Sequence, residues 1–310
     1  MFPGFAVSLL PPMKIQANGI EIEVLVQGPA DGEPLLLIMG LGMQLIAWPE
    51  EMIAELAARG FRVIRFDNRD VGLSTHMDHL GVPNLWLATM QYSMHMPVLA
   101  PYRLTDMAAD TLGVLDALGI GKVHVCGASM GGMIAQHLAS RHPERVASLA
   151  LMMTSSGSRL LPKPQWHVRQ ALMPPPRGLP IEAKVEHLER SMYVIGSPAY
   201  RPDPLRQRVR LEAFVRRSWR PAGALRQMLA VAADGDRSPL LRKLDVPAVV
   251  IHGDADPLVP PAAATDLVRK LRGARLDLIP GMGHDLPLQL VERVVDDIGS
   301  NAQRARVALS

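Results

Sequence analysis

Ser129 stands at a position where a serine side chain could act as a nucleophile. It is the middle residue of Gly-Ala-Ser-Met-Gly (127–131), between an apolar segment typical of a strand and a segment typical of a helix. A strand that enters a helix through so tight a turn holds the residue at the tip in a strained conformation, with its side chain above the sheet. The alternative is a serine that only caps the helix, and this stretch by itself does not separate the two.

Two later segments supply the groups that would activate this serine. A serine hydroxyl becomes a good nucleophile when an imidazole takes its proton, and a carboxylate must fix the tautomer of that imidazole. His284, in PGMGHDLP, follows the last predicted strand, and Asp254 and Asp256, in GDADPLVP, follow the strand before it. We predict Asp256 as the acid because it lies further past its strand, with Pro257 stiffening the turn, whereas Asp254 is expected to brace or cap that turn. The alternative is that both aspartates only form the turn and that His284 is an ordinary loop histidine.

An acyl-transfer site also needs hydrogen-bond donors for the negatively charged oxygen of the tetrahedral intermediate. The N–H of Met130 is one candidate, because the residue after the serine opens a helix and its amide points over the serine. We expect the second donor in the glycine-rich loop 39–44 and assign it to the N–H of Leu41, with that of Gly42 as the alternative. Gly40 and Gly42 let the backbone approach a substrate closely, although a plain glycine-rich turn would have the same composition.

The elements around these residues must bring them to one edge of a sheet. Apolar patterns predict strands at 20–28, 34–40, 61–69, 123–127, 145–153, 247–253 and 274–281, and helices at 48–60, 104–119, 261–271, 288–299 and directly after Ser129. The segment 76–103 is predicted to be irregular. Alternating strands and helices indicate a mostly parallel sheet covered by helices on both faces.

Residues 159–238 interrupt this alternation. They hold no convincing strand and contain helical patterns such as 205–219. We therefore predict an α/β core made of residues 1–158 and 239–310, with residues 159–238 inserted as a helical cap. The cap would lie over the carboxyl edge of the sheet, where open α/β sheets bind ligands.

Together these features resemble the α/β-hydrolase superfamily, and within it the small-molecule esterases of the aclacinomycin-methylesterase type. The likeness covers nearly all of the chain from about residue 14 and is strongest in WPEEMIAELAARGFRVIRFDNRDVGLST, VHVCGASMGG and IHGDADPLVP…LIPGMGHDLP. It implies an eight-stranded sheet. It also implies a nucleophile, acid, base and two oxyanion donors at Ser129, Asp256, His284, Leu41 and Met130, respectively.

We predict hydrolysis of carboxylic esters of small, lipophilic molecules through an acyl-enzyme intermediate. Many superfamily members carry His-Gly before the oxyanion loop, whereas this chain has Met39-Gly40, which keeps the main-chain donor but weakens inference about polar contacts there. Alternatives are a C–C bond hydrolase or an acyltransferase with the same three residues, or a ligand-binding protein on a hydrolase scaffold. The cap is where such enzymes diverge most, so the likeness does not transfer a substrate.

The methionine content predicts the character of the substrate pocket. The chain has 18 methionines against 5 phenylalanines, and methionine makes adaptable apolar surfaces. We predict an apolar pocket formed by Gly40, Gly42, Met43, Met133 and Met282. The alternative is that the methionines simply fill the core.

Five arginines of the helical segment 205–219 are expected to form a mainly solvated face, with contact to an acidic ligand or partner as the alternative. They are Arg206, Arg208, Arg210, Arg216 and Arg217. Two histidines, His124 and His252, fall inside predicted strands and are expected to pack there.

Composition narrows the remaining classes of function. The net charge of +3 does not suggest a nucleic-acid partner, and no apolar run approaches the roughly 20 residues of a membrane span, so no membrane partner is expected. The single cysteine, Cys126, forms no intramolecular disulfide, and a cytoplasmic location is predicted. The sequence has no metal-ligand cluster or phosphate loop, so neither a metal nor a cofactor is expected.

The first 12 residues are apolar and lack the basic region of a secretory signal. They are expected to be a flexible lead-in, or to lie upstream of the true start at Met13. The oligomeric state stays open.

Overall fold

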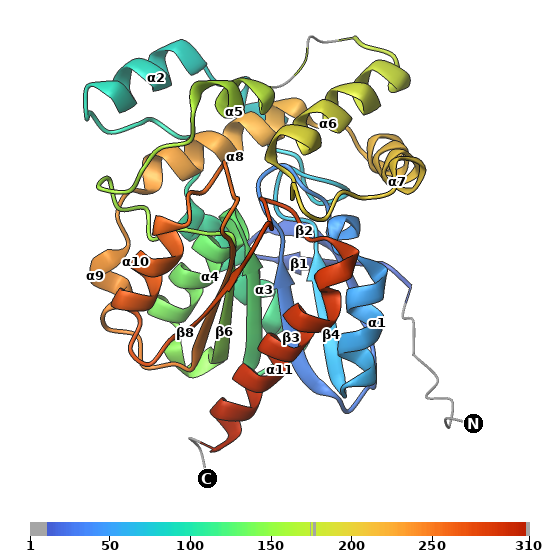
Figure 1. Cartoon of the computed structure of the whole chain (residues 1–310), viewed down its shortest axis with the longest axis vertical. Coiled ribbons are helices and arrows are strands. Elements are labelled where there is room, and N and C mark those ends of the chain that lie inside the picture. The colour runs from blue at the N-terminus through green and yellow to red at the C-terminus, as the bar shows by residue number, and fades with distance from the viewer. Residues whose placement is uncertain (1–10, 174, 176–177, 308–310) are drawn as a thin grey trace.

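The computed structural model describes residues 11–173, 175 and 178–307, and it contains one eight-stranded sheet (Figure 1). The strands are β1 (Met13–Ala17), β2 (Ile20–Gln27), β3 (Glu33–Ile38), β4 (Phe61–Phe66), β5 (Val123–Ala128), β6 (Val146–Met152), β7 (Ala248–Gly253) and β8 (Arg275–Ile279). Their order is β1-β2-β4-β3-β5-β6-β7-β8, and only the pairs β1–β2 and β2–β4 are antiparallel. The predicted mostly parallel, eight-stranded sheet is therefore confirmed.

Helices cover both faces of the sheet because its central strands are apolar on both sides. In β3 the side chains of Leu35 and Leu37 join one buried cluster, and those of Leu36 and Ile38 join another. The first cluster includes apolar residues of α1 (Glu50–Ala58) and α11 (Val291–Val307). The second includes those of α3 (Leu104–Ala117), α4 (Met130–Arg141) and α10 (Ala262–Lys270). The amphipathic patterns in the sequence thus identified the helices that sandwich the sheet.

Between β6 and β7, the described part of the chain holds helices joined by loops, and no strand. It forms α5 (Trp166–Ala171), α6 (Ile181–Ile195), α7 (Pro204–Arg217), α8 (Pro221–Asp234) and the short α9 (Ser238–Leu241). Figure 1 shows α5 to α8 across one end of the sheet, above the loops that follow the parallel strands. This is the edge at which the sequence placed the candidate site residues.

Three elements differ from the sequence prediction. β1 was not predicted, although the turn Asn18-Gly19, with φ of 49° and 76°, is typical of a tight hairpin. The prediction of an irregular segment 76–103 is wrong, because α2 (Leu85–Ser93) lies within it. The side chain of Asn84 caps α2, but the helix is too exposed to show an apolar stripe. α11 begins after a 3₁₀ turn at Leu288–Leu290 and extends eight residues beyond the predicted end at 299.

The predicted lead-in, residues 1–12, lies outside the described residues except for its last two positions. Within the described part of the chain, no helix combines the length and the apolar character needed to cross a membrane.

Candidate active site

Ser129 lies at the tip of a sharp turn between β5 and α4. Its backbone has φ 54° and ψ −119°, a conformation that costs a non-glycine residue on the order of 1–3 kcal/mol. The Ser129 N–H donates to the carbonyl of Met152 at 2.8 Å, which ties the tip to the end of β6. A Cβ at Gly131 would collide with the carbonyl of Ile38, and one at Gly127 with the backbone of Gly131. The predicted strained turn with closely packed arms is thus observed.

Ser129, His284 and Asp256 form one hydrogen-bonded series, although 155 positions separate the serine from the histidine. The Oγ of Ser129 lies 3.0 Å from Nε2 of His284, and Nδ1 of His284 lies 2.7 Å from Oδ2 of Asp256. The other carboxylate oxygen of Asp256 accepts from the N–H groups of Leu258 and Val259, each at 2.8 Å. With both oxygens held in this way, the Asp256 carboxylate is fixed toward the imidazole.

Asp254 has a different role, as the sequence suggested. Its Oδ1 accepts from the N–H of Gly281 at 2.7 Å and so braces the turn after β7 against the turn after β8. Asp256 is nearly fully buried, whereas Asp254 is exposed. The geometry therefore selects Asp256 as the partner of His284.

His252 is a second imidazole beside Asp256. It lies in β7, is fully buried, and its Nε2 lies 2.8 Å from the carbonyl of Val259 and 3.5 Å from Oδ2 of Asp256. Burial lowers the pKa of His252 below its usual value, so this ring stays neutral near pH 7. His252 thus packs within its strand, as expected, and also supports the turn that carries Asp256.

The loop after β3 lies against the serine. A Cβ at Gly40 would come within 3.2 Å of the Cβ of Ser129, which places this backbone beside the hydroxyl. The N–H of Gly42, the alternative oxyanion donor, is already used, since it donates to Oε1 of Gln227 at 2.7 Å. Within the described part of the chain, neither the N–H of Leu41 nor that of Met130 donates to a protein acceptor. This geometry leaves the two assigned amides available.

Gln227, on α8, is a residue that sequence reasoning missed. Its side chain is fully buried and donates from Nε2 to the carbonyl of Arg69 at 2.8 Å, while its Oε1 accepts from Gly42. It thereby joins the loop after β3 to the loop after β4. No local pattern signals this role, because Gln227 is separated from Gly42 by 185 positions.

The loop after β4 supports the same region with buried carboxylates. Oδ1 of Asp67 accepts from the N–H of Leu45 at 2.7 Å, and the side chain of Asn68 donates to the carbonyl of Met39 at 3.0 Å. Arg217, on α7, pairs with Asp67 at 2.7 Å and reaches Gln44 at the same distance. Burial raises the pKa of Asp67, and the Arg217 charge acts against that rise. Asp67 and Asn68 belong to the segment DNRDVG (67–72), for which the sequence by itself indicates no role.

Arg217 therefore does not belong to the solvated face expected for α7, because it forms an ion pair with Asp67. Arg216 follows the expectation, since it is exposed and pairs with Glu212 on its own helix. Arg226, one helix later, is fully buried and pairs with Asp70 at 2.6 Å. Burial favours the neutral form of Asp70, but Arg226 and other donors outweigh it and hold its pKa below the usual value.

The loop that carries His284 is held by the end of α6. The N–H of His284 donates to the carbonyl of Ile195 at 2.7 Å, and the N–H of Gly283 donates to Oγ of Ser197 at 2.8 Å. Asp285 in turn accepts from the N–H of Ser197 at 2.9 Å. Burial raises the pKa of Asp285 above its usual value. Residues between β6 and β7 thus hold the backbone of His284 as well as the loop after β3.

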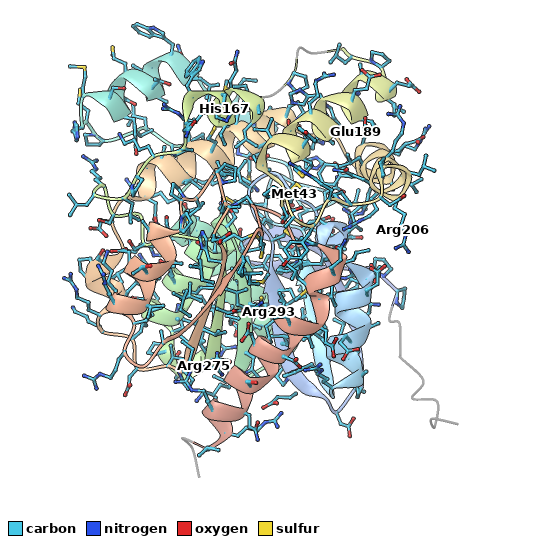
Figure 2. All side chains as sticks on the ribbon, in the orientation of Figure 1. Met43, His167, Glu189, Arg206, Arg275 and Arg293 are labelled. Atoms are coloured by element: carbon cyan, nitrogen blue, oxygen red, sulfur yellow. The ribbon has the colours of Figure 1, made fainter. Side chains whose placement is uncertain are left out.

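The predicted pocket residues differ in their burial and in the clusters to which they belong. Met282 is fully buried in the core cluster of α1 and α11, and Met133 belongs to the cluster on the opposite face. Met43 is half-buried and packs against both the sheet core and a cluster that includes α6 and α7, as Figure 2 illustrates by its position between the two layers. Met133 and Met282 therefore pack in the core, and their assignment to the pocket stays a prediction. Within the described residues, no group of three or more metal-ligating side chains is present.

Comparison with known proteins decides the family. The family described as the alpha/beta hydrolase fold matches residues 33–289, which is most of the chain. The protein belongs to this α/β-hydrolase family. The match begins at β3 and includes all three members of the hydrogen-bonded series and the helical segment between β6 and β7.

Several relatives of this α/β hydrolase carry assigned activities. It is 31% identical to rhodomycin D methylesterase of Streptomyces peucetius over 308 aligned positions, which cover 90% of this chain and 93% of the relative. It is 26% identical to the 2-hydroxy-6-oxononadienedioate/2-hydroxy-6-oxononatrienedioate hydrolase of Paraburkholderia xenovorans, with 88% of both chains covered.

A solved structure shares the fold at lower identity. The meta-cleavage product hydrolase of Pseudomonas fluorescens superposes with a TM-score of 0.70 at 21% identity, over 94% of this α/β hydrolase and 98% of the other chain. At this identity the match speaks for the architecture alone.

Proposed function

We propose that this α/β hydrolase is a serine esterase that cleaves carboxylic esters of small, lipophilic molecules. The observation that carries the proposal is the hydrogen-bonded series from Ser129 through His284 to Asp256, at a strained turn beside two amides that lack a protein acceptor. The methylesterase named among its relatives favours an ester as the substrate class.

In the proposed reaction, Oγ of Ser129 attacks the ester carbonyl carbon while Nε2 of His284 takes its proton. Asp256 holds the tautomer of the imidazole and stabilises its charged form, and the N–H groups of Leu41 and Met130 stabilise the oxyanion. The C–O bond then breaks as His284 protonates the leaving alcohol. A water molecule, deprotonated by His284, attacks the acyl-enzyme and releases the acid and the free serine.

In the same proposal, residues 159–238 act as a cap on a core of residues 1–158 and 239–310. The half-buried position of Met43, between the sheet and the cluster of α6 and α7, supports an apolar substrate space at that boundary. A second candidate is hydrolysis of a C–C bond with the same residues, and the relative from Paraburkholderia xenovorans favours it.

The test combines active-site labelling with a substrate panel. The wild-type protein should be labelled by a fluorophosphonate and should hydrolyse short-chain p-nitrophenyl esters. Ser129→Ala should lose both properties with an unchanged thermal midpoint, whereas Ser93→Ala, which alters an exposed serine on α2, should keep both. A folded protein that is never labelled would indicate a ligand-binding protein. Turnover of vinylogous diketones in preference to every ester would favour the C–C hydrolase.

A further inference from the structure

A surface formed by two segments on either side of Ser129 in the sequence exposes large apolar side chains. We call it the apical surface and define it as the exposed residues of 84–103, which include α2, and of 159–173, which include α5. Trp86 is 73% exposed, Trp166 is 69% exposed and Leu160 is 95% exposed. Further large exposed residues here are Leu87, Met90, Tyr92, Met94, Met96, Leu99, Leu172 and Met173.

The two segments lie side by side, and each packs against the rest of the molecule through buried apolar side chains. The Lys163 ammonium lies 5.1 Å from the ring centre of Tyr92, which joins residues 159–173 to α2, and Figure 1 shows α2 and α5 close together at the end of the molecule opposite the C-terminal end of α11. Val168 of α5 is fully buried, and Ala88 of α2 packs against Leu229 of α8. The exposed side chains therefore stand on helices that are anchored from below.

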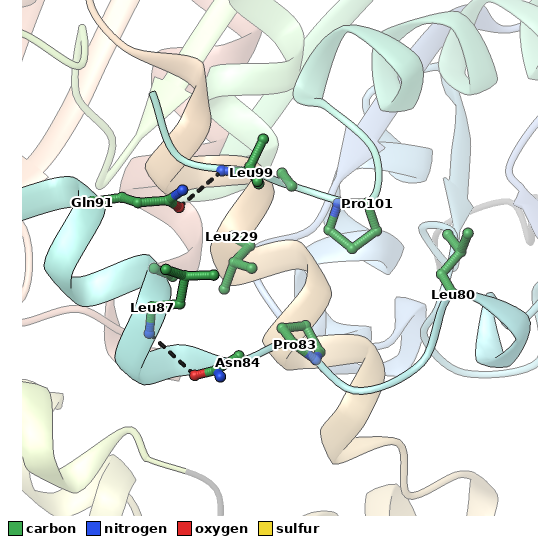
Figure 3. A pocket seen from close by; sticks show the side chains of 10 residues that line it. Leu80, Pro83, Asn84, Leu87, Gln91, Leu99, Pro101 and Leu229 are labelled. Atoms are coloured by element: carbon green, nitrogen blue, oxygen red, sulfur yellow. Dashed lines mark hydrogen bonds between the residues drawn. The ribbon is translucent and has the colours of Figure 1, made fainter. Parts of the chain in front are cut away.

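Apolar surface also continues beneath α2. A cavity of about 330 Å³ lies there, and Figure 3 shows it between α2, the loop that follows and α8. Its lining is mostly aliphatic, with Leu87, Leu99 and Leu229 among its residues, and the side chain of Gln91 is held by the N–H of Leu99. Large apolar side chains that are exposed together mark interaction sites.

The charge of the apical surface identifies the kind of partner. The sequence holds no aspartate or glutamate in residues 79–105 or 145–181, whereas 64 residues of average composition in this chain would hold about six. The exposed cations in the two segments include Arg103, Arg159, Lys163 and Arg169. On the neighbouring α6, Glu186 and Glu189 are paired with arginines. The surface is thus apolar and cationic without interspersed acids.

Tryptophan, tyrosine and long cations together suit the boundary between lipid headgroups and acyl chains. The aromatic rings are apolar with a polar edge, and lysine and arginine extend their charges toward phosphate while their stems stay in apolar surroundings. Arg169 lies over the ring of Trp166 at 6.0 Å, so cation and ring would meet the same partner. A second copy fits less well, because a two-fold interface through this surface would face cations with cations.

We propose that the apical surface docks the protein peripherally onto a bilayer that contains anionic phospholipid. This inference goes beyond the proposed esterase activity and does not depend on it. It departs from the sequence-based expectation of no membrane partner. That expectation followed from the lack of a spanning segment, and a peripheral surface needs no such segment.

The test is sedimentation of the full-length protein with vesicles of phosphatidylcholine alone and of equal parts phosphatidylcholine and phosphatidylglycerol. The wild-type protein should bind the anionic vesicles at least tenfold more strongly, and binding should weaken as salt rises from 50 to 500 mM. The double variant Trp86→Ser/Trp166→Ser and the double variant Lys163→Glu/Arg169→Glu should each lower binding at least tenfold. The thermal midpoint reports whether these variants remain folded.

A matched control removes exposed apolar residues elsewhere. Leu205 and Val209 of α7 are as exposed as the two tryptophans, and Leu205→Ser/Val209→Ser should bind vesicles like the wild type. Equal binding to neutral and anionic vesicles, or unchanged binding by both apical variants, would overturn the proposal. So would the absence of vesicle binding together with a solution dimer that Trp86→Ser/Trp166→Ser dissociates, which would assign the surface to a second copy.

Discussion

Replacing Asp256 by asparagine tests the hydrogen-bonded series at its most constrained point. Oδ1 of Asp256 accepts two backbone N–H groups at 2.8 Å, while Oδ2 faces Nδ1 of His284 at 2.7 Å. An asparagine at 256 can keep its oxygen toward the two amides only if its NH₂ group faces the imidazole. The opposite orientation would set that NH₂ group against two N–H donors, which is worse. Asp256→Asn should therefore present a donor to Nδ1.

A donor at that position forces the imidazole into the wrong tautomer. Nδ1 must then accept, so Nε2 carries the proton and faces the Ser129 hydroxyl as a donor, unable to take its proton. In serine proteases the same change lowers kcat about 10⁴-fold, which corresponds to about 5 kcal/mol in the activation barrier. Because the side chain keeps its shape and its bonds to Leu258 and Val259, KM should change little.

The assay is hydrolysis of p-nitrophenyl butyrate, with the rate of fluorophosphonate labelling as a second measure of serine reactivity. Asp254→Asn is the matched control, because Asp254 lies on the same turn but accepts only from the Gly281 N–H, and kcat should stay within about fivefold of the wild type. If Asp256→Asn keeps more than one tenth of the wild-type kcat, or if Asp254→Asn is the more damaging change, the acid assignment is refuted.

Three further outcomes are expected. Gln227→Leu leaves the Gly42 N–H and the Arg69 carbonyl without a partner. Each unpaired group costs about 1–3 kcal/mol, so urea unfolding should show a lower free energy of unfolding. A lower kcat with little change in KM would show that Gln227 positions the oxyanion loop. Gly131→Ala puts a methyl group into the Ile38 carbonyl and should abolish fluorophosphonate labelling; normal labelling would contradict the packed turn. Asp297→Asn should remove a pH dependence of stability. Burial, then the hydrogen bond with Asp277, raises the pKa of Asp297 from 3.8 to about 7, so the folded state holds a proton that the unfolded chain releases, and stability from this group falls between about pH 4 and 7. Urea unfolding at pH 5 and pH 8 should therefore show a smaller decline for the variant than for the wild type.

The positions of Ser129, Asp256 and His284 could be predicted because each follows a strand whose apolar run is recognisable. Parallel strands end at a common edge, so topology alone brings such residues together. The preference for Asp256 over Asp254 rests in the sequence on its position further past the strand end and on Pro257. The structure adds the two amides that hold its Oδ1. The assignment of Leu41 stays a prediction, supported by the use of the Gly42 N–H elsewhere.

Other features left no local signal in the sequence. α2 exposes Trp86 and buries Ala88 two residues later, so its apolar residues follow no stripe and only the Asn84 cap marks its start. In the sequence, Gln227 is like any polar residue of a helix, because the two backbone groups that it binds are more than 150 positions away. The ion pair of Arg217 with Asp67 is hidden for the same reason among five arginines of similar spacing.

The helices between β6 and β7 do more than cover the sheet. The carbonyl of Ile195, at the end of α6, accepts from the N–H of His284. Arg217 of α7 holds the loop after β4, and Gln227 of α8 holds the loop after β3. Two of these contacts fix loops that carry a proposed functional group, His284 and the Leu41 amide, and the third fixes Asp67, which accepts from Leu45 in the loop after β3. Placement errors of about 1 Å can cost on the order of a hundredfold in rate. Exchanging this segment to change specificity should therefore lower kcat as well, unless the exchanged helices reproduce these three contacts.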